Sequence, residues 1–132
     1  MTKLRVYDEH DHLLALDLRD LLKLLAPRSL AARWTVAPVR EADGEARFEA
    51  TGEEGERLER LAQVGATVTG QELAAMAAKV GQVIWGEFVG METTAPGSPW
   101  VIIRAIDSTC YEIETDDMAV LNKVKVTYRQ VR

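Results

Sequence analysis

Two segments with strand periodicity constrain the fold of this chain more than any other feature of its sequence. They are QVIWGEFVGM, residues 82–91, and WVIIRAID, residues 100–107. Both are rich in β-branched and aromatic residues, and the stretch between them, ETTAPGSP, is typical of a loop. Two strands joined directly by a short loop predict an antiparallel hairpin.

Glu87 is the one carboxylate within the first of these strands. Because successive side chains point to opposite faces of a sheet, its expected neighbours on one face are Val83, Trp85, Val89 and Met91. If Met91 lies opposite Trp100 across the loop, Glu87 lies opposite Arg104. A slip of one residue would turn Glu87 away from Arg104, so this register predicts an ion pair within an otherwise apolar face.

Several other segments have helical spacing. Asp17 is a typical N-cap for a helix with leucines on one face of residues 18–25, which Pro27 is expected to end. Thr69 and Glu72 have the spacing of a capping box, and Gly81 is expected to end the helix that they begin. A short helix is predicted over residues 57–63. A last helix is predicted over 118–131, where the stretch KVKVTY also alternates like a strand.

Further strands are predicted in the first half of the chain and after residue 109. The segments 4–8 and 13–17 flank the turn residues EHDH and predict a short hairpin. The segments 33–40 and 46–51 flank Asp43-Gly44, a dipeptide that strongly favours a hairpin turn. CYEIET, residues 110–115, predicts one more strand.

This order of elements predicts an α+β fold. We expect a single domain over residues 1–132, with a mainly antiparallel sheet built from hairpins and three to four helices packed on one face. TGEEGE, residues 51–56, is expected to be an exposed connector, because its glycines and acidic residues have nothing to bury.

Composition and charge limit the setting and the partners. No apolar run approaches about eighteen residues, so we expect no membrane association. Cys110 is the only cysteine, and a reducing compartment such as the bacterial cytoplasm is the expected location. Residues 41–72 hold nine acidic residues and three arginines, a net charge of −6, whereas the whole chain carries −5. This acidic band disfavours nucleic acid and favours a basic partner.

The sequence contains no P-loop, zinc-ligand set or nucleophile elbow, so we expect no cofactor and regard an enzyme as the less favoured interpretation. The candidate catalytic residues are Glu87 and Asp107 as acid or base and Cys110 as nucleophile. The two histidines, His10 and His12, lie far away along the chain.

Asp8, His10 and His12 alternate and could in principle provide three metal ligands on one face of a strand. A polar turn beside a hairpin produces the same residues, and we expect no metal.

A binding surface is the favoured interpretation. The expected patch consists of Trp85, Met91 and Trp100 around the Glu87–Arg104 pair, on a sheet face that no helix covers. The predicted function is a small non-catalytic protein-binding module. It would act through this patch or the acidic band as a neutralising partner, of immunity or inhibitor type, for a basic toxin or nuclease.

Two alternatives remain open. One is a small hydrolase-like enzyme that uses Glu87 or Asp107 as acid or base. The other is a structural subunit or homodimer scaffold that pairs through the uncovered sheet face.

Overall fold

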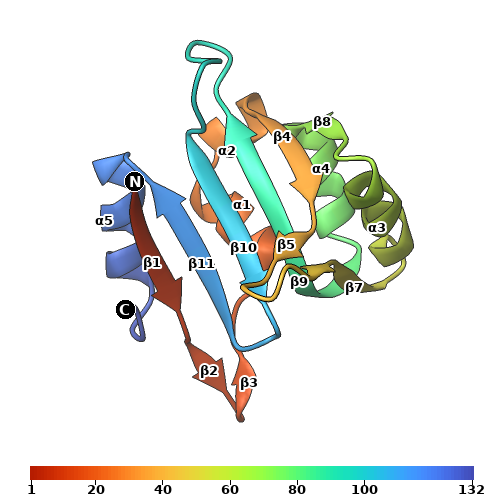
Figure 1. The fold of residues 1–132 in the computed structure, drawn as a ribbon. Helices are drawn as coiled ribbons and strands as arrows, with labels where there is room; N and C mark the ends of the chain where they lie inside the picture. The colour runs from red at the N-terminus through yellow and green to blue at the C-terminus, as the bar shows by residue number, and fades with distance from the viewer.

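The computed structural model describes residues 1–132 and has an α+β fold with a mainly antiparallel sheet and five helices (Figure 1). The main sheet has the strand order β1-β11-β10-β9-β4-β8, and β7 also pairs with β9. Its strands are β1 (Thr2–Val6), β4 (Arg33–Ala37), β7 (Glu49–Gly52), β8 (Thr67–Thr69), β9 (Val80–Met91), β10 (Val101–Ile106) and β11 (Cys110–Thr115). Two small hairpins join β2 (Glu9–His10) to β3 (Leu13–Leu14) and β5 (Val39–Arg40) to β6 (Ala46–Arg47).

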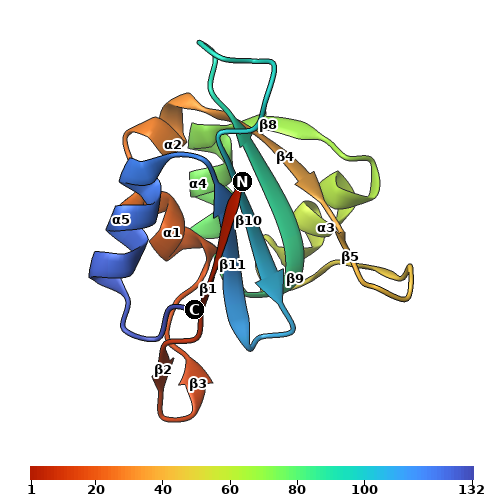
Figure 2. The same ribbon diagram turned by 60° about the vertical axis from the view of Figure 1, so that its left-hand side comes forward.

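The helices leave one face of the sheet open. Behind the sheet in Figure 1 lie α1 (Leu18–Leu24), α2 (Arg28–Ala31), α4 (Gly70–Ala77) and α5 (Met118–Thr127), and α3 (Gly55–Gln63) lies beside β7. Figure 2 shows the layer of α1, α4 and α5 from the side. A single cluster of 28 buried hydrophobic residues fills the space between helices and sheet. None of the helices combines the length and the apolar character that crossing a membrane requires.

The hairpin of β9 and β10 has the register predicted from the sequence. Arg104 pairs with Glu87, and Ile102 pairs with Val89. Val83, however, does not share the face of Glu87, because the pairing of β7 with β9 shifts between Trp85 and Val83. Such a bulge reverses the alternation of side chains, and Val83 is therefore buried in the core.

Asp17 begins α1 as predicted and also joins the helices to the sheet. Its carboxylate accepts hydrogen bonds from the backbone N–H of Leu18 and, at 3.3 Å, from that of Val83 in β9. It also accepts one from the hydroxyl of Tyr111 in β11, at 2.6 Å. Asp20 completes the capping box by accepting from the backbone N–H of Asp17. A single buried side chain thus links α1, β9 and β11.

The predicted N-caps of α4 and α5 are also present, whereas α3 begins at Gly55, two residues before its predicted start. The Thr69 hydroxyl accepts from the N–H of Glu72 at 3.1 Å, and Asp117 caps α5 by accepting from the N–H of Ala119. The C-terminal ends of these helices differ from the prediction. α4 ends at Ala77, and Gly81 lies within β9 rather than at a helix C-terminus. The ambiguous stretch after residue 122 is helical as far as Thr127.

Pairing near the N-terminus also differs from the prediction. β1 pairs with β11, and the only hairpin in this region is the two-residue pairing of β2 with β3. Its turn residues, Asp11 and His12, both have positive φ angles, a conformation that Asp and His adopt more readily than most residues.

α2 and β8, which have four and three residues, were not predicted, because segments this short lack a recognisable period.

The segment 51–56 is divided between two elements. Thr51 and Gly52 end β7, and α3 begins at Gly55, so that Glu53 and Glu54 form the turn. Gly55 is buried, and a Cβ atom there would lie 2.5 Å from the carbonyl oxygen of Ala50. Only glycine therefore permits this close approach of α3 to β7.

Replacement of Asp17 by alanine should lower the free energy of unfolding by about 2 to 4 kcal/mol, because it removes an N-cap and leaves two buried donors without an acceptor. Tyr111→Phe, which removes only the hydroxyl, should cost about 1 kcal/mol. Urea unfolding measures both. Asp116→Ala, at a side chain that is 81% exposed, is the control, and an equal loss for Asp17→Ala would contradict the linking role of Asp17.

Candidate functional site

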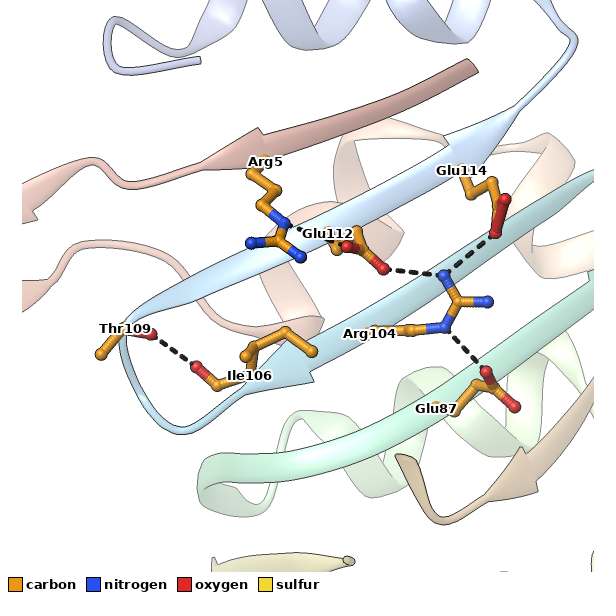
Figure 3. Close-up of polar contacts among 7 residues, drawn as sticks. All are labelled: Arg5, Glu87, Arg104, Ile106, Thr109, Glu112 and Glu114. Carbon is orange, nitrogen blue, oxygen red and sulfur yellow. Dashed lines mark hydrogen bonds and ion pairs between the residues drawn. The ribbon is translucent and has the colours of Figure 1, made fainter. Parts of the chain in front are cut away.

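The open face of the sheet carries a row of alternating charges. Arg5 on β1 lies opposite Glu112 on β11, which lies opposite Arg104 on β10, which in turn lies opposite Glu87 on β9. Figure 3 shows these four side chains following one another across four adjacent strands. Opposite charges on directly paired residues stabilise a sheet, so the row is consistent with the strand register.

Arg104 is the centre of this row. Its Nε donates to Glu87 Oε1 at 2.8 Å, and its Nη1 donates to Glu112 Oε2 at 2.8 Å and to Glu114 Oε1 at 3.0 Å (Figure 3). The other oxygen of Glu112 accepts from Arg5 Nε at 3.0 Å. Both oxygens of Glu112 are therefore engaged, whereas one terminal nitrogen of Arg104 and one oxygen of Glu87 remain outside the network.

Burial and hydrogen bonding oppose each other in this cluster. Burial raises the pKa of Glu112, but the hydrogen bonds from Arg104 and Arg5 outweigh it, so the pKa lies below its ordinary value of 4.5. For Arg104, burial lowers the pKa, and the hydrogen bonds to Glu87, Glu112 and Glu114 raise it above the usual value for arginine. Glu112 and Arg104 thus remain ionised at neutral pH.

A cleft of about 630 Å³ lies over the row. Its floor includes Glu87, Arg104 and Glu112. Residues 37–42, which run from the end of β4 through β5 into the following turn, line one side. In Figure 1, β5 lies in front of β9 and β10, and the three strands are in contact. The indole of Trp85 and the side chain of Ile106 add apolar surface.

Comparison with protein-family models, with curated proteins and with solved structures found no match.

Three of the five residues predicted to form a binding patch line this cleft: Trp85, Glu87 and Arg104. Met91 is half-buried on β9, where it pairs with Arg33. Trp100 lies on the opposite side of the sheet. It is 7% exposed, donates its indole N–H to Asp117 and packs edge-on against Trp34 at a centroid distance of 6.2 Å.

The expected aromatic patch is therefore not formed. The reason is that Trp100 precedes β10, so its side chain does not follow the alternation of that strand. The backbone N–H of Trp100 donates to the carbonyl of Gly90, and the indole ring enters the core. Whether Trp85, Glu87 and Arg104 bind a partner stays a prediction.

The candidate catalytic residues do not converge. Asp107 lies in the turn between β10 and β11, where it and Ser108 have positive φ angles. Cys110 is buried, and burial raises the pKa of its thiol, which favours the less reactive protonated form. His10 is exposed at the β2–β3 hairpin. Only Glu87 lines the cleft.

The metal candidates are also apart. Asp8 accepts hydrogen bonds from the backbone N–H groups of Arg129 and Gln130, and so holds the C-terminal segment against the start of the chain. His10 lies 3.4 Å from the carboxylate of its neighbour Asp11. The structure contains no group of three His, Cys, Asp or Glu side chains placed to hold a metal ion.

The sequence-based prediction missed Arg5, Glu112 and Glu114. A signal for them was present, because the strand alternation of CYEIET places Glu112 and Glu114 on one face. The pairing of β1 with β11, which brings Arg5 to Glu112, joins segments more than a hundred residues apart and has no local signal.

A second group of charged side chains lies around the β5–β6 hairpin, β7 and α3. Apart from Glu72 on α4, the acidic residues of the band 41–72 lie on or next to these elements, and α3 packs against β7. Six acidic residues of the band are exposed and form no ion pair. One is Glu72 on α4, and the other five lie on or next to the β5–β6 hairpin, β7 and α3: Glu45, Glu49, Glu53, Glu56 and Glu59. We call these five residues the acidic surface.

A double-mutant cycle tests the ion pair on the open face. Glu87→Gln and Arg104→Met, made singly and together, should show a coupling of about 1 to 3 kcal/mol, because the two side chains are only 25% and 19% exposed. The control cycle uses Glu54 and Arg57, whose arginine is 54% exposed, and should give about 0.5 kcal/mol or less. Chemical denaturation measures both, and strict additivity at Glu87 and Arg104 would disprove the coupling.

The lowered pKa of Glu112 predicts a pH dependence. A carboxyl group whose pKa is depressed by folding contributes stability above its unfolded pKa, and this contribution is lost as the pH falls through the folded value. The difference in unfolding free energy between the wild type and Glu112→Gln should thus have its largest value above about pH 4.5 and become smaller as the pH falls below it. A difference that grows on acidification would contradict the assigned cause.

Proposed function

We propose that this protein is a small non-catalytic module that binds a basic protein through the acidic surface, as a neutralising partner of a toxin or nuclease would. The observation that supports this function is the presence of five exposed carboxylates without ion-pair partners on adjacent elements. Elsewhere, on the open face, the carboxylates Glu87, Glu112 and Glu114 each form an ion pair with Arg104.

Uncompensated charge on one side of a molecule raises the rate at which a partner of opposite charge associates. The acidic surface lies on a hairpin, a strand and a helix that share the core through Phe48 and Leu58, so its carboxylates are presented on a folded framework. A framework of this kind loses little conformational freedom on binding, which favours affinity.

The hydrolase-like alternative has less support. In the cleft, hydrogen bonds from Arg104 and Arg5 hold the pKa of Glu112 below its ordinary value, which disfavours proton donation by Glu112 at neutral pH. The carboxylate of Glu87 accepts a hydrogen bond from Arg104. Asp107, His10 and Cys110 lie outside the cleft lining. A homodimer through the open face also has less support, because β5 lies over β9 and β10 and would obstruct a second flat sheet.

The proposal predicts that charge reversal on α3 weakens partner binding. Glu56→Lys with Glu59→Lys should lower the affinity for a basic partner, isolated from the native host, by about tenfold or more, chiefly through slower association. Binding kinetics at two salt concentrations measure this effect, and the wild-type association rate should fall as salt rises.

The matched control is Glu9→Lys with Asp116→Lys, which changes the net charge equally at exposed positions outside the acidic surface. Its affinity should stay within about twofold of the wild type. Equal losses for both pairs, or capture of an acidic partner only, would refute the proposal.

A further inference from the structure

The cleft on the open face differs in charge from the rest of this acidic protein. It is lined by four basic side chains, Lys3, Arg5, Arg40 and Arg104, and by three acidic side chains, Glu41, Glu87 and Glu112. The lining therefore carries one excess positive charge in a chain whose net charge is −5.

The basic side chains of the cleft have more unused hydrogen-bonding atoms than Glu87 and Glu112 have. Both oxygens of Glu112 are engaged by arginines, and one oxygen of Glu87 is engaged by Arg104. By contrast, Lys3 and Arg40 are exposed and form no ion pair within the chain. Arg5 is 49% exposed and uses only its Nε atom in its pair with Glu112. A ligand entering the cleft thus meets mainly unused hydrogen-bond donors.

The positions of these donors define where an anion would lie. Lys3 and Arg5 alternate on β1 and face the open side, whereas Arg40 comes from β5 on the opposite wall. Trp85 and Ile106 add apolar surface, as do the wall residues 37–39. A volume of about 630 Å³ falls within the range usual for small-molecule sites, which combine apolar walls with a few polar groups.

We infer that this cleft binds a small molecule with a carboxylate or phosphate group, held by Lys3, Arg5 and Arg40, whose apolar part lies against Trp85 and Ile106. Paired guanidinium and ammonium groups suit both kinds of anion, since each offers several donors to the oxygens. The site is separate from the acidic surface proposed to bind a protein, and neither function requires the other.

Tryptophan fluorescence can test this inference with defined probes. Trp34 and Trp100 are buried in the core, so Trp85 is the indole that a ligand in the cleft would contact. The probes are phenyl phosphate, benzoate and the uncharged analogue benzyl alcohol. Phenyl phosphate or benzoate should change the emission, whereas benzyl alcohol should not, and comparison of the two anions shows whether phosphate or carboxylate is preferred.

The variant Lys3→Gln with Arg40→Gln should weaken anion binding by about tenfold or more, because charge-assisted hydrogen bonds are lost. Lys123→Gln with Lys125→Gln removes the same charge from exposed positions of α5 and should leave the affinity within about twofold of the wild type. Since Lys3 and Arg40 are exposed and unpaired, the melting temperature of the first variant should stay unchanged.

Amide chemical shifts provide the second measurement, and probe-induced changes should gather around Lys3, Arg5, Trp85 and Arg104. Any one of three results would overturn the inference. The first is that no probe binds at about 10 mM, a concentration that would detect even millimolar affinity. The others are that the control variant weakens binding equally, or that benzyl alcohol binds as well as the anions.

Discussion

The buried carboxylate of Asp17 is the interaction on which the arrangement of layers depends. It caps α1 and bonds to β9 and β11, the two strands that carry Glu87 and Glu112. A polar group in a core must be bonded to be tolerated, so Asp17 is compatible with only one placement of the helix over the sheet. Burial is the larger cause that raises the pKa of Tyr111, and the negative charge of the nearby Asp17 is the second. The Tyr111 hydroxyl therefore stays protonated and donates to Asp17.

Arg28 has a comparable role at the other end of the sheet. It forms a bidentate pair with Glu92 at the end of β9 and bonds to Asp117 at the N-terminus of α5. Its guanidinium also stacks over Trp100, 4.5 Å from the ring centroid, on the edge of the core. These contacts hold Trp100 inward, and the open face consequently has Trp85 as its only tryptophan.

The two charged regions of the molecule differ in how their charges are compensated. On the open face, arginines and glutamates alternate across paired strands and form ion pairs, and the unpaired Lys3 and Arg40 line the cleft. On the acidic surface, five carboxylates have no partner within the chain. This separation of charge is the basis of the two binding sites proposed above.

Local signals predicted much of the fold, and one part of the site. The N-caps Asp17, Thr69 and Asp117 and the pairing of Glu87 with Arg104 follow from residue type and spacing within short segments. The inward position of Trp100 could not be predicted in this way, because alternation ends where β10 begins. The bulge that buries Val83 depends on the pairing of β7 with β9, which the sequence does not reveal.

The sequence by itself determined most of the longer helices and strands, and that Glu87 and Arg104 meet, since turn chemistry and side-chain period act over a few residues. Only the tertiary structure decided that Arg5 and Glu112 extend this pair into a row, and that β5 closes a cleft above it. Those contacts join residues far apart in the chain. They form because burial of one shared core selects the strand order, and no local pattern encodes that order.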